Sequence, residues 1–462
     1  MIVANFINGT AVSADETSPL VDPAAGEEFG RAVVSRAAEV DAAVQAAADA
    51  FPTWSRTTPG ERQLALLKLA DLLEANAEAV ADAEIRATGK IRAVVLGEEI
   101  PQCVDQIRFF AGAARALGTA AAGEYVSGAT SYQRREPVGV IAQITPWNYP
   151  LMMAVWKIAP ALAAGNTVVV KPADTTPSST VLLASLAARV LPAGVFNVVL
   201  GDRDTGRLLV EHPVPAMVSL TGSTRAGVEV ARSAAATVKR THLELGGNAP
   251  VLVFDDVDVA SAAEGIVGAA FYNAGQDCTA ATRVLVHSAV HDEFVAALVK
   301  AASAQVPGTD FGPLNSAAQL DRVLTMLGRS SAKVHCGGKR YGSTGFFLEP
   351  TVISGLAQED ELVQEEPFAP VITVQSFGSD DEAVELANGV PQGLASSIWT
   401  RDTSRAAALT TRLDFGIVWV NTHGLVASEM PHGGFGASGY GKDLSMHGLE
   451  DYTRVKHVMI AH

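Results

Sequence analysis

The sequence has few cysteines and no long apolar run, and each shortage excludes a class of protein. Its 462 residues include 3 cysteines, Cys103, Cys278 and Cys336, without C-x-x-C spacing. Neither a disulfide framework nor a metal site is therefore expected. No run of about 18 apolar residues occurs, and the opening "MIVANFINGT" lacks the basic and apolar segments of a signal peptide. We expect a soluble, cytoplasmic protein that does not cross a membrane.

Charged residues are also scarce, and their balance is acidic. They make up 18% of the chain against 48% hydrophobic residues, and the formal net charge is -16. A nucleic acid would be repelled by this charge, so it is excluded as a partner. The composition is that of a folded globular protein, and the length predicts two or three domains.

The first quarter of the chain reads as a hairpin followed by helices. In "ANFINGTAVSA", Asn8 and Gly9 supply turn residues between short apolar runs. From about Ala37 to Ala116, Ala, Leu, Glu and Arg recur at helical spacing, as in "ERQLALLKLADLLEANAEAV". This spacing predicts a helical layer, in which Cys103 has an ordinary packing role.

Two α/β units follow. From Val138, the runs "VGVIAQITPW", "NTVVVKPAD", "VFNVVLGD" and "AMVSLTGSTRAG" alternate with helical stretches, which predicts a parallel sheet of the nucleotide-binding type. A second set, with "APVLVF", "ATRVLVHS", "APVITVQSF" and "GIVWVNTHG", begins near Gly247 and predicts a second domain across a cleft. The segment from Thr119 to Pro137 and the tail "DYTRVKHVMIAH" are expected to be strands that pair with each other or with another subunit.

The common dinucleotide fingerprint G-x-G-x-x-G is absent, so it cannot support a cofactor prediction. In its place, Gly222 and Ser223 of "TGSTRAG" end an apolar strand and open a helix. Backbone amides at that helix start, together with the Ser223 hydroxyl, are able to hold a phosphate. The alternative, which the motif alone favours, is an ordinary N-cap.

Three residues are candidates for chemistry. Cys278 in "GQDCTA" is a candidate nucleophile, because Gly275 permits close backbone approach and Thr279 leaves room around the sulfur. Glu244 in "HLELGGNAP" is a carboxylate among apolar neighbours and a candidate general base, while the Asn148 amide in "TPWNYP" can donate to an oxyanion. The alternatives are an apolar filler, a surface glutamate and a turn asparagine. Together the three predict an acyl-enzyme reaction with a redox cofactor.

The run of motifs "PWNYP", "KPAD", "TGSTRAG", "LELGGN", "GQDCTA", "EEPFAPV" and "EMPHGG" resembles the NAD(P)-dependent aldehyde dehydrogenases, from "FINGT" to "GLEDYTRVKHVM". The wording of "YNAGQDCTA", "SEMPHGG" and "SGYGKDLSMHGLEDYT" looks most like the bacterial gamma-aminobutyraldehyde dehydrogenases. The resemblance implies an α/β fold with two doubly wound domains and a small β oligomerisation extension. The two segments expected to be unpaired strands predict a homo-oligomer, either a dimer or a tetramer built from dimers. The implied boundaries are 1–118 with 138–246 for the NAD-binding domain, 247–437 for the catalytic domain, and 119–137 with 438–462 for the oligomerisation strands.

The resemblance also implies a mechanism. Cys278 attacks an aldehyde, the Asn148 amide and the Cys278 N–H hold the oxyanion, a hydride leaves for the nicotinamide, and Glu244 activates the water that hydrolyses the thioester. The expected reaction is the oxidation of 4-aminobutanal to 4-aminobutanoate in polyamine breakdown. The alternatives are another aldehyde (betaine aldehyde, aromatic or aliphatic), an acyl transfer to coenzyme A, against which Glu244 argues, and a non-catalytic member of the fold.

For the cofactor, the resemblance assigns Lys171 and Asp174 to the adenosine ribose, Ser223 to the pyrophosphate, and Glu366 with Phe368 to the nicotinamide ribose. The Asp174 carboxylate would repel a 2′-phosphate, so NAD is expected rather than NADP, although Arg225 would partly offset that repulsion. The predicted cofactor residues are completed by Ile144, Thr145, Pro146, Trp147, Gly206, Gly222 and Leu245.

For an aminoaldehyde, the hypothesis is an acidic partner for the distal ammonium, with Asp277 the first candidate. Ala369 stands where the family commonly has Gly, which predicts a changed turn if the position needs positive φ, and Asn248 replaces a common Lys, which removes an ion pair. The predicted substrate residues are Tyr149, Trp156, Asp277 and Thr279, with Glu99, Asp105 and Glu429 as further acidic candidates.

Overall fold

The N-terminal hairpin forms as its turn residues predict. In the computed structural model, which describes residues 2–462, β2 (Asn5–Ile7) and β3 (Thr10–Val12) pair antiparallel. Asn8 and Gly9 take positive φ of 52° and 80°, as a two-residue hairpin turn requires. A separate three-stranded sheet has the order β1-β5-β4 and consists of β1 (Ile2–Val3), β4 (Glu16–Asp22) and β5 (Glu27–Val34).

The predicted helical layer is confirmed, and its second helix shows why it begins where it does. The Thr58 side chain accepts from the Glu61 backbone N–H, and the Glu61 carboxylate reaches back to the Thr58 N–H, which together form a capping box. Among residues 2–462, no helix is long and apolar enough to span a bilayer. The layer comprises α1 (Ala37–Trp54), α2 (Pro59–Ala75), α3 (Ala77–Thr88), α4 (Arg92–Val94), the π-helix η1 (Val95–Glu99) and α5 (Ile100–Ala113).

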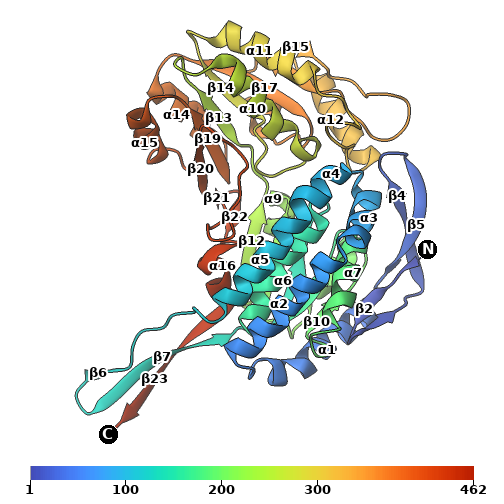
Figure 1. Cartoon of the computed structure of the whole chain (residues 1–462), viewed down its shortest axis with the longest axis vertical. Coiled ribbons are helices and arrows are strands. Elements are labelled where there is room, and N and C mark those ends of the chain that lie inside the picture. Colours follow the sequence, from blue (N-terminus) through green and yellow to red (C-terminus); the bar gives the residue numbers. More distant parts are fainter. Residues whose placement is uncertain (1) are drawn as a thin grey trace.

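The first large sheet has eight strands in the order β22-β12-β11-β8-β9-β10-β2-β3, and its five central strands are parallel, as predicted. Its outer strands β22 and β2 run antiparallel to their neighbours, which the sequence did not predict. Helix α6 is buried along its whole length, between this sheet and the helical layer (Figure 1). The strands are β8 (Val140–Ile144), β9 (Thr167–Lys171), β10 (Phe196–Val198), β11 (Met217–Gly222), β12 (Arg240–Leu245) and β22 (Gly439–Tyr440); the helices are α6 (Pro150–Ala163), α7 (Ser178–Ala187), α8 (Arg203–Glu211) and α9 (Thr224–Ala235).

The second large sheet has seven strands in the order β15-β16-β17-β14-β13-β19-β20, and all except β15 are parallel to their neighbours. Its strands are β13 (Pro250–Val253), β14 (Arg283–His287), β15 (Lys333–Cys336), β16 (Thr351–Ser354), β17 (Val371–Phe377), β19 (Ala395–Trp399) and β20 (Ile417–Val420). The connecting elements are α10 (Val259–Phe271), the 3-10 helix η2 (Tyr272–Gly275), α11 (His291–Ser303), α12 (Ala317–Arg329), α13 (Glu361–Gln364), α14 (Asp380–Asn388), α15 (Thr403–Thr410), and the paired β18 (Gln392–Gly393) and β21 (Phe435–Gly436).

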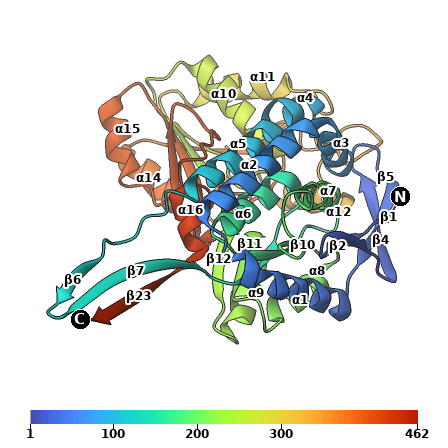
Figure 2. The same cartoon turned by 60° about the horizontal axis from the view of Figure 1, so that its bottom comes forward.

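The two strands predicted to pair with each other do so. After α16 (Ser445–Asp451), β23 (Thr453–Ala461) runs antiparallel to β7 (Ala129–Pro137), and β6 (Gly123–Val126) completes the three-stranded sheet. The β7–β23 ladder projects from the body of the molecule as a long arm (Figures 1 and 2). The domain boundaries given above stay a prediction.

Candidate active site

The three predicted catalytic residues lie on segments that meet beside the carboxyl ends of the first sheet. Asn148 follows β8, Glu244 is the penultimate residue of β12, and Cys278 follows η2. The Asn148 side-chain Nδ2 donates to the backbone carbonyl of Gln276 at 3.0 Å, two residues before the cysteine. The amide is thus fixed against the loop that carries the thiol.

Two glycines of the "LELGG" motif let the chain pass between the thiol loop and another predicted site residue. A Cβ on Gly247 would lie 2.1 Å from the carbonyl oxygen of Cys278, and a Cβ on Gly246 would lie 2.8 Å from Oε2 of Glu366. Both separations are below van der Waals contact, so any side chain here would displace Cys278 or Glu366.

The loop before the thiol has an unusual backbone. Asn273, Ala274 and Gly275 take successive positive φ values of 50°, 57° and 66°. A Cβ on Gly275 would lie 2.2 Å from the carbonyl oxygen of Ala369, which confirms the predicted close approach. Asn273 Nδ2 donates to the carbonyl of Asn148 at 2.9 Å, so this loop and the Asn148 segment hold each other.

The environment of the thiol is acidic. Burial raises the pKa of Cys278, and the carboxylates of Asp277, Glu244 and Glu366 raise it further. The groups that shift the pKa of Cys278 include no cation that would counter the effect of these carboxylates. The resting residue is therefore a neutral thiol, and its half-buried side chain is still reachable.

Glu244 is buried, with 2% of its surface exposed, so the alternative of a surface glutamate is wrong. Its Oε1 has no hydrogen-bond partner within the described part of the chain. Its Oε2 lies 3.6 Å from Nδ1 of His432, which is longer than a hydrogen bond. A carboxylate with an unpaired oxygen is suited to accept a proton.

Three predicted cofactor residues cluster at the ends of β8 and β9. Ile144 and Lys171 end those strands, and a Cβ on Gly206 would lie 3.4 Å from Lys171 Cδ and 3.9 Å from Ile144 Cδ1. Lys171 is buried, which lowers its pKa, and its Nζ donates to the carbonyl of Pro172 at 3.0 Å. Asp174, three residues later, is exposed.

At the start of α9 the structure contains the ordinary N-cap. The Ser223 hydroxyl accepts from the Ala226 N–H at 3.3 Å, and Ser223 is exposed. A Cβ on Gly227 would lie 2.5 Å from Leu245 Cδ1, so α9 packs directly on the end of β12. A phosphate role for Gly222 and Ser223 stays a prediction.

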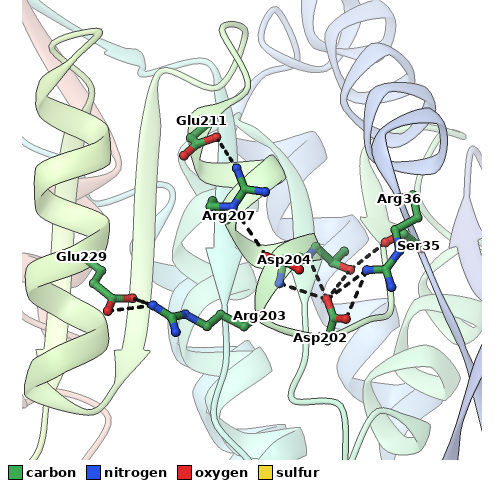
Figure 3. Close-up of polar contacts among 9 residues, drawn as sticks. Ser35, Arg36, Asp202, Arg203, Asp204, Arg207, Glu211 and Glu229 are labelled. Carbon is green, nitrogen blue, oxygen red and sulfur yellow. Dashed lines mark hydrogen bonds and ion pairs between the residues drawn. The ribbon is translucent and has the colours of Figure 1, made fainter.

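Helices α8 and α9 are linked at the surface by an ion pair. Asp202 caps α8 by accepting from the Asp204 N–H at 2.9 Å, and it also accepts from Arg36 at 3.1 Å (Figure 3). Arg203 of α8 pairs with Glu229 of α9 at 2.8 Å in the same view. Because both side chains of this pair are exposed, it contributes at most about 1 kcal/mol to stability.

The departure at Ala369 does not strain the backbone. Ala369 is buried and is not a positive-φ residue, whereas its neighbour Phe368 has φ of 54°, so the condition under which a changed turn was expected at Ala369 is not met. The Phe368 ring meets Trp147 edge to face, with centroids 5.3 Å apart. Asn248 is buried and its Nδ2 donates to the carbonyl of Val363 at 2.7 Å, so the side chain is satisfied without an ion pair.

Asp277 is held by donors from two segments. The Tyr149 hydroxyl donates to its Oδ2 at 2.7 Å, and the Thr279 N–H and hydroxyl both donate to its Oδ1 at 2.7 Å. The other face of this cluster is cationic, since Lys90 Nζ lies 4.0 Å from the centre of the Tyr149 ring. Lys90 also donates to both oxygens of Glu99 at 2.8 Å, in a buried ion pair.

Neither of the two remaining acidic candidates shares a hydrogen bond with that cluster in the described part of the chain. Asp105 of α5 accepts from the Ser428 hydroxyl at 2.6 Å, and both Asp105 and Glu429 are exposed. Trp156 of α6 is buried and meets the ring of His432 edge to face, with centroids 4.8 Å apart.

A model described as the aldehyde dehydrogenase family matches residues 11–458. The chain belongs to the aldehyde dehydrogenase family. It is 38% identical to a putative aldehyde dehydrogenase from Burkholderia cenocepacia, with a TM-score of 0.97, covering 99% of this chain and 97% of that one. It is 34% identical to an indole-3-acetaldehyde dehydrogenase of P. syringae solved with NAD+ (TM-score 0.97, 99% and 96% covered) and 32% identical to a betaine aldehyde dehydrogenase from Staphylococcus aureus solved with NAD+ (TM-score 0.96, 99% and 95% covered). The predicted aldehyde dehydrogenase-like fold is confirmed.

Sequence reasoning assigned no role to two histidines that this family member places at the site. His423 Nε2 donates to the carbonyl of Thr279 at 2.5 Å, and burial lowers its pKa to about 4, so it is neutral and braces the thiol loop. His432 lies between Trp156 and Glu244. The motif "EMPHGG" contained His432, but nothing in its spacing indicated which residue it would face.

Proposed function

We propose that this chain oxidises an aldehyde to its carboxylic acid with NAD as the hydride acceptor. Family membership and solved relatives that hold NAD+ support the reaction class. The observation that carries the proposal is the meeting of Asn148, Cys278 and Glu244: a fixed amide, a reachable thiol and a buried carboxylate with a free oxygen.

In the first half-reaction, Cys278 Sγ gives its proton to solvent water and attacks the carbonyl carbon, so that the C=O electron pair moves to oxygen. The Asn148 amide and the Cys278 N–H donate to that oxyanion. When the oxyanion collapses, the hydrogen on carbon leaves as a hydride, and a thioester on Cys278 results. NAD, when bound, takes up this hydride.

In the second half-reaction, Glu244 removes a proton from a water that attacks the thioester carbon. The C–S bond then breaks, the acid leaves, and the thiolate of Cys278 is regenerated. Burial of Glu244 and its unpartnered Oε1 support this role, because the proton has a free lone pair to occupy.

The residues fit a dinucleotide. The absence of a side chain at Gly206, beside the buried Lys171, leaves space against the ends of β8 and β9, and the exposed Asp174 would repel a 2′-phosphate. Lys171 and Asp174 would hold the adenosine ribose, and Glu366 with Phe368 the nicotinamide side. The remaining proposed cofactor residues are Ile144, Thr145, Pro146, Trp147, Gly206, Gly222, Ser223 and Leu245.

We propose 4-aminobutanal as the substrate, because the carboxylate of Asp277, next to the nucleophile in the chain, is placed to attract a distal ammonium. Asp277 is the first partner, since its donors, Tyr149 and Thr279, are uncharged and leave its charge available. Glu99 is less suitable because Lys90 already neutralises it.

The test is the ratio of kcat/KM for 4-aminobutanal to that for butanal, measured with NAD and NADP by NADH or NADPH release, with betaine aldehyde in the same panel. The two substrates share the reacting carbon, so the ratio cancels general damage to the site. We expect Asp277→Asn to lower the ratio about tenfold, and Glu385→Gln, which alters an exposed carboxylate of α14, to leave it unchanged. A wild-type ratio near one would refute the pairing of the ammonium with Asp277. If no aldehyde in the panel is oxidised, the proposed dehydrogenase activity is refuted.

We also propose that the chain forms a homo-oligomer through its arm. The outer strand β23 exposes Val455, Met459 and Ile460 by 55%, 49% and 53%, and its free edge can pair with another chain. Sedimentation of Met459→Lys with Ile460→Lys should show dissociation. An unchanged sedimentation coefficient would refute the arm as the interface.

A further inference from the structure

His432 faces the carboxylate of Glu244 with an unused nitrogen. The ring is buried, its Nδ1 lies 3.6 Å from Oε2 of Glu244, and neither Nδ1 nor the carboxylate Oε1 has a hydrogen-bond partner among residues 2–462. Buried polar atoms are rarely left unpaired, so two of them on facing side chains require an explanation. A small rotation of either side chain would bring Nδ1 and Oε2 within hydrogen-bonding distance.

The backbone and the ring of His432 are both held by neighbouring residues. Its backbone N–H donates to the Asp443 carbonyl at 2.9 Å, and the Asp443 N–H donates back to the His432 carbonyl at 2.8 Å. Trp156 packs edge to face on the ring, with interplanar angle 64°. On the other side, a Cβ on Gly433 would lie 2.8 Å from Oε1 of Glu244, so the carboxylate rests against the backbone next to His432.

We propose that His432 is a positioning residue for the general base: its Nδ1–H donates to Oε2 of Glu244 and holds the carboxylate ionised and ready to receive the proton of the hydrolytic water. The inference rests on the proposed function, because it assigns a partner to the base of that reaction. A phenylalanine would fill the same space and keep the packing on Trp156, but it would offer no donor.

The charged groups around the ring agree with a donor role. Burial alone would lower the pKa of His432, but the carboxylates of Glu244, Asp443 and Asp277 raise it above its usual value. Asp443 is itself engaged by buried partners at its carboxylate, which leaves Glu244 as the partner nearest to Nδ1. Lys442 is half-buried and donates to the carbonyls of Gly433 and Gly434, so its ammonium is directed to the backbone.

The test separates acylation from deacylation in three variants. The enzyme is mixed with NAD and an aldehyde, the first turnover is followed by NADH release, and decay of the acyl-enzyme is followed by mass spectrometry across pH. His432→Phe removes the donor and keeps a ring, and His432→Asn restores a donor. His335→Phe is a matched control, since His335 of β15 is a half-buried histidine that forms a hydrogen bond with Ser354 of β16.

We expect His432→Phe to slow acyl-enzyme decay about ten- to a hundredfold while the first-turnover NADH release is unchanged. The acidic limb of decay should move up by about one pH unit, because Glu244 without its donor holds a proton more tightly. His432→Asn should recover part of the rate, and His335→Phe should behave as wild type. If His432→Phe does not fold, the test is the acidic limb of acyl-enzyme decay in His432→Asn, compared with that of the wild type.

The proposal is overturned if His432→Phe decays at the wild-type rate with the same acidic limb, or if it changes only KM, which would make the ring a wall for the substrate. It is also overturned if His432→Asn is no faster than His432→Phe. Failure of the proposed function is seen differently: the wild-type protein itself would form no adduct on Cys278.

Discussion

Resistance to alkali should depend on one buried histidine. His242 of β12 is fully buried, with Nδ1 2.8 Å from Asp451 Oδ2 and Nε2 3.1 Å from Asp443 Oδ1. Lys157 of α6 lies 3.2 Å from the other oxygen of Asp443. Burial alone would lower the pKa of His242, but Asp443 and Asp451 raise it to about 9.

The size and sign of the effect follow from this pKa. An unfolded histidine titrates at 6.5, and the folded one at about 9, a difference that corresponds to about 3 kcal/mol. The full contribution is present below pH 6.5, where both states bind the proton. It is lost as the pH rises to about 9, because over that window the folded state keeps a proton that the unfolded state has released. For 462 residues, 3 kcal/mol corresponds to about 3 °C in Tm.

The assay is thermal unfolding of the wild type and of His242→Asn between about pH 6 and pH 10. We expect the variant to be less stable near neutrality and to lose less stability than the wild type as the pH rises. Asp105→Asn, which alters an exposed carboxylate, serves as the control. If the wild type and His242→Asn lose stability in parallel over this window, His242 is not a charged member of the network and the reasoning is refuted.

Three further predictions concern the site. Glu244→Gln should acylate normally but release acid at least about a hundredfold more slowly, so that mass spectrometry detects a stable adduct; normal turnover would contradict its role. Gly275→Ala should lower Tm and activity together, because its Cβ would lie 2.2 Å from the Ala369 oxygen at φ of 66°. The control Gly112→Ala, on an exposed helical surface with no described atom outside its own helix within 4 Å of the new Cβ, should raise stability by about 0.5–1 kcal/mol. Asp174→Ser should raise kcat/KM with NADP about tenfold relative to NAD, and an unchanged ratio would show that the carboxylate does not select the cofactor.

Local patterns were sufficient for most of the fold. The β-branched runs became β8 to β11, and the positive φ of Asn8 and Gly9 is the conformation that an Asn-Gly turn adopts. The antiparallel edges were not predictable, because β22 is a two-residue strand whose only signal is its partner β12. The network around His242 was not predictable either, because Lys157 and Asp443 are 286 positions apart in the sequence and no periodicity connects them.

The site was predictable to the extent that its contacts are made by backbone. "LELGG" places the candidate base two residues before Gly246 and three before Gly247, and the missing side chains there make room for Glu366 and the carbonyl of Cys278. Such a requirement leaves a fixed string in the sequence, because no other residue satisfies it. The contact between His432 and Glu244 is instead made by side chains from distant segments, and many residues could fill the same volume. A motif therefore indicates where the backbone must lack a side chain because another segment packs against it. The side chains that set the protonation of a carboxylate come from distant segments, so they are identified only in the folded structure.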